Sequence, residues 1–141
     1  MSTLKAFNFK NQKALIRVDF NVPLDDNLNV TDDTRIQSAK KTILKVLEDG
    51  GSCILMSHLG RPKAKEPEFS LKNIVSKLED ILGVNVLFST DCIGAQATQM
   101  AKELQPGQIL LLENLRYHKE EKEGNISFAK ALSELGDIYI N

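Results

Sequence analysis

The strongest indication of the fold lies at Cys53-Ile54-Leu55-Met56-Ser57-His58-Leu59-Gly60-Arg61-Pro62, where a short apolar run passes directly into a polar tail. The same change occurs at residues 15–21 and again at residues 109–118. Short apolar runs bounded by polar residues are typical of buried parallel strands. The tails of such strands meet at the carboxyl edge of one sheet, where open α/β sheets bind ligands. The sequence therefore predicts a functional site built from these three tails.

Strand-like and helix-like segments alternate along the rest of the chain. We expect five strands, at 14–19, 52–56, 84–88, 109–112 and 137–141. Helices are expected between them, at 31–48, 71–82, 91–104 and 125–135, with a small hairpin at 22–30 and loops at 59–69 and 119–124. This β-α-β series predicts an α/β fold with a parallel sheet and helices on both faces.

The bulk composition excludes several classes of partner. A chain of 141 residues, 42% apolar and 26% charged, suits one globular domain with a real core. Its net charge of −1 favours neither nucleic acid nor a membrane surface, so any anion site must be a local concentration of cations. No apolar run approaches the roughly 20 residues that span a bilayer, and the N-terminus lacks the apolar core of a signal peptide. We therefore expect a cytoplasmic protein.

The two cysteines, Cys53 and Cys92, have no C-x-x-C spacing. We expect each to be a small buried side chain rather than a metal ligand or one half of a disulfide.

The last predicted strand reaches the end of the chain, where a helix covering the sheet would normally follow. This pattern predicts a truncated protein whose sheet is incomplete at its C-terminal end. The uncovered edge and apolar face would favour self-association, which light scattering at high concentration would detect.

Cationic side chains in the tails are the candidate anion ligands. His58 and Arg61 flank Gly60, and a glycine lets backbone approach a ligand closely; the alternative is a surface turn with incidental charge. Arg35 lies in the first turns of a helix, where the dipole disfavours a cation, so either Asp32 or Asp33 or a bound anion must compensate it. Arg116 either pairs with Glu113 or Glu120 or joins the same anion site, since arginine presents a planar fork to phosphate.

Other polar residues are open to two interpretations. Asp19 and Asn21, at the end of the first strand, either receive a hydroxyl-bearing substrate or cap the turn at Pro23. Arg17, within an apolar strand, is expected to be one half of a buried ion pair. The charged run at 119–123 is interpreted as a solvated loop.

Several common motifs are absent from the sequence. It contains neither G-x-x-x-x-G-K-[ST] nor G-x-G-x-x-G, the loops that cradle nucleotide phosphates, and neither H-E-x-x-H nor G-x-S-x-G. The residues alone therefore predict an anion-binding half-site with no cofactor site and no metal site.

Four motifs together resemble the phosphoglycerate kinase family, in its order and at its approximate spacing. The resemblance covers residues 14–141, and the strand at 137–141 is also similar to one in the family's N-terminal domain. The four motifs are Arg17-Val18-Asp19-Phe20-Asn21-Val22-Pro23, Thr34-Arg35-Ile36, Ser57-His58-Leu59-Gly60-Arg61-Pro62 and Leu112-Glu113-Asn114-Leu115-Arg116.

The resemblance implies an enzyme of glycolysis. The family reversibly transfers a phosphoryl group from 1,3-bisphosphoglycerate to ADP, giving 3-phosphoglycerate and ATP. Its two Rossmann-like domains divide the work, since the N-terminal domain binds the glycerate and the C-terminal domain binds Mg²⁺ with ADP or ATP. The resemblance further implies a small-molecule substrate, no nucleic-acid or membrane partner, and a monomeric full-length enzyme.

Roles for individual residues follow from the resemblance. Asp19 and Asn21 would orient the hydroxyl and carboxylate end of the glycerate. Arg35 would be the catalytic residue, facing the migrating phosphoryl group and neutralising its charge. The other expected contacts are His58, Arg61 and Arg116 to the phosphate that is not transferred, and the backbone of Phe20, Leu59 and Gly60 along the pocket.

The chain departs from the family in length. Residues 1–141 correspond to most of the N-terminal, 3-phosphoglycerate-binding domain, and the nucleotide-binding domain is absent. We expect this chain alone to bind neither Mg²⁺ nor nucleotide and to show no turnover. Binding of 3-phosphoglycerate should be weak, sensitive to salt and lost in Arg61→Ala.

Two other functions remain open. A stand-alone, non-catalytic phosphate-binding or anion-binding module would have a stop codon after Asn141, whereas a kinase would continue into Asp-Ala-Phe. A scaffold domain, whose arginines make only surface ion pairs, would not respond to phosphate ligands.

Overall fold

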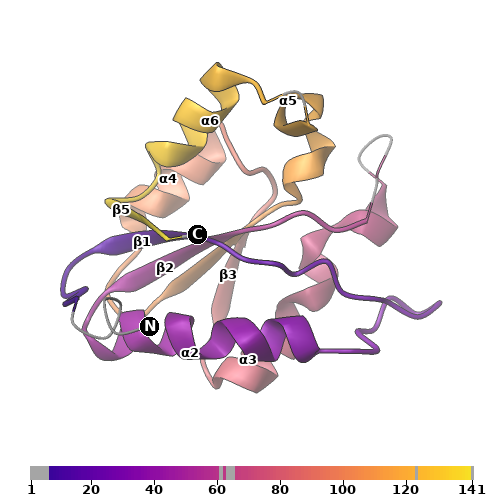
Figure 1. The fold of residues 1–141 in the computed structure, drawn as a ribbon, viewed down its shortest axis with the longest axis horizontal. Coiled ribbons are helices and arrows are strands. Elements are labelled where there is room, and N and C mark those ends of the chain that lie inside the picture. The colour runs from indigo at the N-terminus through magenta and orange to yellow at the C-terminus, as the bar shows by residue number, and fades with distance from the viewer. Residues whose placement is uncertain (1–6, 61, 63–65, 123, 141) are drawn as a thin grey trace.

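Five parallel strands form one sheet with the spatial order β3-β4-β2-β1-β5 (Figure 1). The structure is a computed structural model that describes residues 7–60, 62, 66–122 and 124–140. The parallel sheet predicted from the sequence is confirmed. The strands are β1 (Lys13–Arg17), β2 (Ser52–Met56), β3 (Val86–Ser89), β4 (Ile109–Leu112) and β5 (Ile138–Ile140).

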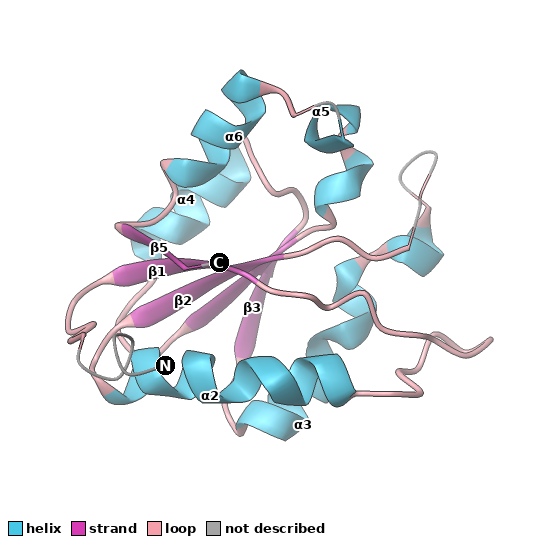
Figure 2. Cartoon of the chain, in the orientation of Figure 1, coloured by secondary structure: helices cyan, strands magenta, loops and turns pink. Residues whose placement is uncertain are grey.

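Helices cover both faces of the sheet (Figure 2), which confirms the three layers. One face carries α2 (Thr34–Glu48) and α3 (Val75–Leu82), and the other carries α4 (Ala95–Glu103) and α6 (Ile126–Ser133). The shorter helical segments are η1 (Pro67–Phe69), η2 (Leu71–Ile74), η3 (Leu115–Tyr117) and α5 (Lys119–Lys122). None of the described helices combines the length and the apolar composition needed to cross a membrane.

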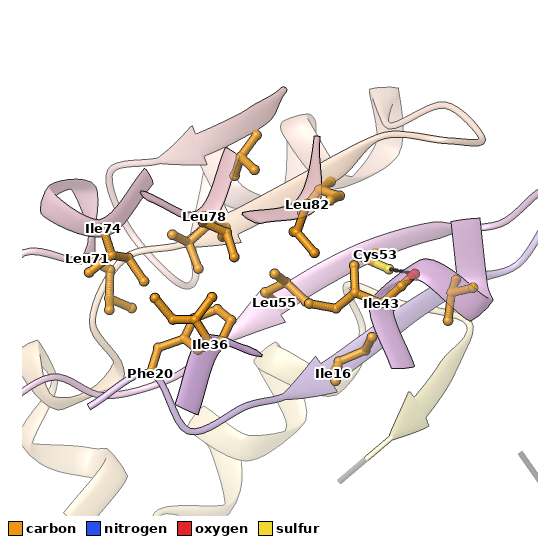
Figure 3. Packing of buried hydrophobic residues seen from close by; sticks show 14 of the residues in the cluster. Ile16, Phe20, Ile36, Ile43, Cys53, Leu55, Leu71, Ile74, Leu78 and Leu82 are labelled. Carbon is orange, nitrogen blue, oxygen red and sulfur yellow. Dashed lines mark hydrogen bonds between the residues drawn. The ribbon is translucent and has the colours of Figure 1, made fainter. Parts of the chain in front are cut away.

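Each central strand supplies side chains to both cores, which explains why the strands are continuously apolar. In β2, Cys53 and Leu55 face the core under α2 and α3, while Ile54 and Met56 face the core under α4 and α6. Figure 3 shows the first of these cores, where Ile43 and Leu78 from the two helices meet the sheet. Burial on both faces leaves polar residues room only at the strand ends.

Two helices begin later than their sequence patterns predict. α2 begins at Thr34 instead of residue 31, because the Asp32 carboxylate accepts hydrogen bonds from the Thr34 N–H at 2.9 Å and hydroxyl at 2.7 Å and holds the preceding residues in a turn. α4 begins at Ala95 instead of residue 91, because Gly94 has a φ of 95°, outside the helical region.

Smaller differences occur at other boundaries. The segment predicted as the first turn of α3 is the separate 3-10 helix η2, and Ser70 caps it by accepting the Lys72 N–H at 3.2 Å. β1 ends at Arg17 and β3 begins at Val86, two residues inside the predicted limits of 19 and 84. The small hairpin contains the expected antiparallel pair, Leu24 with Val30.

The prediction of a solvated loop at 119–124 is wrong for its first four residues. Residues 119–122 form the helical turn α5, and the side chain of Glu121 is only 10% exposed. Its carboxylate turns inward because two arginines at the edge of the sheet attract it, as described below.

Both cysteines are free and buried, as predicted. The Cys53 thiol lies 3.7 Å from the Ile43 carbonyl oxygen (Figure 3). Burial raises the pKa of Cys53 and of Cys92 to about 12, so both remain neutral thiols at physiological pH.

Candidate functional site

The polar tails that follow β1, β2 and β4 meet at the carboxyl edge of the sheet. These three strands are neighbours, so their ends are adjacent. Ser57, the first residue after β2, contacts both other tails: its hydroxyl accepts the Phe20 N–H at 3.0 Å, and its carbonyl oxygen accepts the Leu115 N–H at 3.0 Å. The predicted convergence of the three tails is confirmed.

Asn114 fixes the tail of β4 against the tail of β2. The residue is fully buried, and its Nδ2 donates to the carbonyl oxygens of Leu59 and Phe69, both at 2.8 Å. Its Oδ1 accepts the N–H of Leu59 at 3.2 Å and of Arg116 at 3.0 Å. All the hydrogen-bonding capacity of the amide is used. Asn114 therefore sets the backbone of two predicted site residues, Leu59 and Arg116.

Glu113 joins η2 to the same edge. Its Oε2 accepts the Ser70 hydroxyl at 2.6 Å, and its Oε1 accepts the N–H of Leu71 at 2.9 Å and of Asn114 at 2.8 Å. Because its carboxylate is buried among these donors, Glu113 acts as a structural anchor. It is not the ion-pair partner that the sequence offered for Arg116.

Arg35, in the first turn of α2, lies over the tail of β1. Its Nη1 donates to the Asn21 carbonyl oxygen at 2.6 Å and lies 3.3 Å from Asp19 Oδ1. Asp19, rather than Asp32 or Asp33, is its ion-pair partner within the part of the chain that the structure describes. The Arg35 side chain is 51% exposed, and its other N–H donors make no hydrogen bond to a residue that the structure describes. Those donors are available to an anion.

Asn21 joins the tails of β1 and β2. Its Oδ1 accepts the Gly60 N–H at 2.8 Å. Gly60 has a φ of 61°, a left-handed conformation that glycine adopts without strain. A shallow pocket of about 260 Å³ opens beside Asn21 and Gly60, and another of about 210 Å³ lies beside Asp19 and Arg35. The tail of β1 is thus open to a small ligand on both sides.

Three basic side chains lie next to this tail, and we call Arg17, His58 and Arg116 the cationic cluster, in which the two arginines carry the positive charge. Glu121 bridges its two arginines: Oε1 accepts a hydrogen bond from Arg17 Nη2 at 2.7 Å, and Oε2 lies 3.6 Å from Arg116 Nε. Arg17 is therefore one half of an ion pair, as expected, although its side chain is 36% exposed. Arg116 pairs with Glu121 and not with Glu120.

Burial and the neighbouring charges shift the pKa of His58. Burial lowers its pKa, and the positive charges of Arg116 and Arg17 lower it further, while Glu121 and Asp19 oppose this effect without reversing it. The pKa therefore lies below its usual value, and the imidazole is neutral at pH 7 in the free protein. A bound anion would reverse this balance and favour the protonated ring.

His118, the second histidine in the tails, lies elsewhere. Its Nε2 is 2.7 Å from Asp91 Oδ1, and with Cys92 these residues bring three potential metal-ligand atoms within 4.8 Å of one another. Burial raises the pKa of Asp91, but its hydrogen bonds from His118 and the Cys92 N–H outweigh this and lower it overall. The Asp91–His118 contact and the neutral Cys92 thiol account for the arrangement without an ion.

The structure describes all but one of the residues predicted for the site. Arg61 lies outside the described residues. Phe20 and Leu59 bury their side chains in the core, so only their backbone is available at the edge. The other six described residues, gathered at the same carboxyl edge, are Asp19, Asn21, Arg35, His58, Gly60 and Arg116.

Three residues that contribute to the candidate site were not predicted from the sequence: Ser57, Asn114 and Glu121. Asn114 carries a detectable signal, because a polar amide so close to a fully apolar strand is expected to be buried and to need partners. Glu121 carries none, because its run of alternating charges is typical of a solvated segment.

Comparison with known proteins places this geometry in a family. The family model described as phosphoglycerate kinase matches residues 4–141. A phosphoglycerate kinase from Porphyromonas gingivalis is 57% identical over 99% of this chain and 39% of its own length, and the cytosolic enzyme of Nicotiana tabacum is 45% identical over the whole chain and 35% of its own.

Solved structures agree with this assignment. The phosphoglycerate kinase of Coxiella burnetii superposes with a TM-score of 0.82 at 36% identity, covering 95% of this chain and 33% of its own. That of Pyrococcus horikoshii superposes with a TM-score of 0.85 at 29% identity, covering 96% and 35%. This chain therefore spans little more than a third of the length of the relatives that it matches. It belongs to the phosphoglycerate kinase family.

Proposed function

We propose that residues 1–141 form most of the glycerate-binding domain of a phosphoglycerate kinase. The complete enzyme would reversibly transfer a phosphoryl group from 1,3-bisphosphoglycerate to ADP, giving 3-phosphoglycerate and ATP. One observation carries this proposal: the cationic cluster lies at the sheet edge beside the Asp19–Asn21 tail and Arg35. A small acid with a phosphate at one end and a hydroxyl near the other matches that arrangement of charges.

Each end of the substrate has its own set of residues. The phosphate that is not transferred would bind His58, Arg61 and Arg116, because arginine donates two parallel hydrogen bonds to phosphate oxygens. Asp19 and the Asn21 amide would receive the hydroxyl and carboxylate end. Catalysis of this kind depends on positioning and on stabilising charge that develops in the transition state.

Arg35 is the proposed catalytic residue. Its Nη1 is already held by Asn21 and Asp19, and these contacts would keep the remaining N–H donors beside the reacting end of the substrate. Those donors would stabilise the charge that spreads over the migrating phosphoryl group. The ion pair with Asp19 also offsets the unfavourable position of a cation at the start of α2.

The magnesium nucleotide of the family does not fit this segment. The sequence has no glycine-rich phosphate loop. The side chains of the central strands β2 and β4 are packed within the two hydrophobic cores. Mg²⁺ and the nucleotide would bind a portion of the complete enzyme that this chain does not contain.

We also propose a cytoplasmic location. The relatives from Nicotiana tabacum and Triticum aestivum are named cytosolic, whereas one from Arabidopsis thaliana is named chloroplastic. The cytoplasm is also where glycolytic substrates would reach the site.

Binding of 3-phosphoglycerate tests the proposed site. Calorimetric titration of this chain should give saturable binding that weakens with salt, and Arg116→Ala should weaken it about thirtyfold because a charge-assisted contact is lost. Lys41→Ala, which removes a cation from the exposed side of α2, should bind like the unsubstituted chain. Equal binding by Arg116→Ala would contradict the assignment. A coupled assay of the chain alone should give no ATP, and turnover above the buffer blank would overturn that part.

Proton uptake should accompany binding. In the free protein the pKa of His58 is lowered, and a bound phosphate would raise it, so between the two values binding takes up a proton. Affinity should therefore increase as the pH falls from 7.5 toward 6, by up to about tenfold for each unit of pKa change. Titration calorimetry in two buffers of different ionisation enthalpy would count the protons.

His58→Gln provides the control for that experiment. This substitution should remove the proton uptake by the histidine and leave only the proton uptake that arises from the phosphate's own pKa of about 6. An unchanged proton count in His58→Gln would exclude His58 as the group that titrates.

A further inference from the structure

Glu121 occupies an unusual place among the residues of the site. It is an acidic side chain located where an anionic substrate is proposed to bind, and it is 10% exposed. One carboxylate oxygen contacts Arg17, the last residue of β1, and the other faces Arg116, which lies in η3 after β4. No role for Glu121 was predicted from the sequence, and the proposed mechanism does not use it.

The charge of Glu121 is retained despite burial. Burial raises its pKa, but the hydrogen bond from Arg17 and the charges of Arg17 and Arg116 outweigh that effect and lower the pKa overall. The carboxylate therefore remains ionised at neutral pH and offsets like-charge repulsion within the cationic cluster.

Glu121 contacts Arg116 at a particular atom. The 3.6 Å separation joins Oε2 to Nε, the nitrogen nearest the side-chain stem, and Nε is a buried donor without a hydrogen-bond partner in the described part of the chain. The terminal nitrogens of Arg116, which form the fork that suits phosphate, make no hydrogen bond to the described residues. The Arg116 side chain is 27% exposed, so a ligand can reach it.

These contacts restrain the two arginines from one side. The Arg116 backbone is fixed by Asn114, and Glu121 attracts the inner nitrogen of its guanidinium. Arg17 is held by a hydrogen bond from its Nη2. A restrained guanidinium loses less conformational entropy when it binds phosphate, and the affinity is therefore higher.

We infer that Glu121 is a positioning residue, which orients Arg116 and Arg17 toward the phosphate of the bound glycerate. The inference rests on the proposed function, since it assigns a role within that same site. It opposes the simpler expectation that a carboxylate near an anion site only repels the ligand. Positioning of the arginines and repulsion of the ligand predict opposite effects for variants that change either the charge or the length of the side chain at position 121.

Three substitutions of Glu121 distinguish the effect of its charge from the effect of its side-chain length. Glu121→Gln removes the charge but keeps an oxygen that can accept the hydrogen bond from Arg17. Glu121→Asp keeps the charge but is one methylene shorter, so it cannot contact both arginines from the same backbone position. Glu121→Ala removes both properties. Glu120→Gln, one residue earlier, is the matched control, because it makes the same change of charge at a side chain that forms no ion pair with any described residue.

Calorimetric titration of the 141-residue chain with 3-phosphoglycerate distinguishes the roles. Positioning predicts that Gln binds within about threefold of the unsubstituted chain, while Asp and Ala each bind about tenfold more weakly, about 1.4 kcal/mol. Repulsion alone predicts that Gln and Ala bind more tightly and that Asp is unchanged, and this outcome overturns the inference. Glu120→Gln should match the unsubstituted chain.

Two further measurements complete the test. Urea unfolding identifies any variant that fails to fold, and if Ala does so, the comparison of Asp with Gln still decides. The ¹H–¹⁵N signal of Arg116 Nε should move in Asp and Ala without ligand, and an unmoved signal would count against positioning. Absence of saturable binding by the unsubstituted chain would overturn the proposed function and the inference with it. Normal binding with equal dissociation constants for all four variants would overturn the inference alone.

Discussion

Asn114→Ala is expected to lower the free energy of unfolding by about 3 to 4 kcal/mol, a large share of the stability of a small domain. The substitution removes four hydrogen bonds from a side chain with no exposed surface. It leaves the N–H and carbonyl oxygen of Leu59 and the carbonyl oxygen of Phe69 without their partner. Stranded buried groups retain their full desolvation cost, which is why the expected loss exceeds that of an ordinary hydrogen bond.

Urea denaturation followed by circular dichroism measures this loss. Asn73→Ala is the matched control, because Asn73 Nδ2 makes one hydrogen bond, to the Pro67 carbonyl oxygen at 2.9 Å, near the surface. It should cost less than about 1 kcal/mol. A loss of that small size in Asn114→Ala as well would show that the loops after β2 and β4 do not depend on this amide.

The strands were predictable because burial on both faces leaves a strong local signal. β2 and β4 have the bounds that their apolar runs predicted, and both are buried along their whole length. Helix starts were harder, because Asp32 and Gly94 compete with helix formation through a side-chain hydrogen bond and a positive φ. Competition of that kind depends on the geometry of the turn, which amphipathic spacing does not encode.

The location of the candidate site followed from topology, whereas its ion pairs did not. Strands that run parallel place their tails at one edge, so His58 and Arg116 could be assigned there from chain order. The partner of each arginine depends on where a separate segment folds. Arg35 pairs with Asp19 across the gap from α2 to β1, and Arg17 with Glu121 across more than a hundred residues. The sequence offered near neighbours as possible ion-pair partners, Asp32 or Asp33 for Arg35 and Glu113 or Glu120 for Arg116. The structure pairs these two arginines with Asp19 and Glu121 instead.

Arg35→Ala, in a full-length phosphoglycerate kinase that carries this segment, is expected to lower kcat about a thousandfold. The proposed role is to meet charge that develops only as the phosphoryl group migrates, so the KM for the glycerate substrate should change far less. Arg35 is 51% exposed, and among the described residues its guanidinium forms polar contacts only with Asp19 and Asn21. Stability should therefore change by less than about 0.5 kcal/mol. Steady-state kinetics with unfolding as a companion measurement checks both parts.

Arg35→Lys separates the charge from the shape of the guanidinium. Lysine keeps one positive charge but presents a single point of donation, so it cannot hold Asn21 and Asp19 with one edge while offering parallel donors to a phosphoryl group. We expect it to recover only about tenfold of the lost kcat. Full recovery would mean that charge alone suffices, which removes the reason for an arginine fixed at the start of α2. A large rise in KM with kcat unchanged would instead assign Arg35 to ground-state binding.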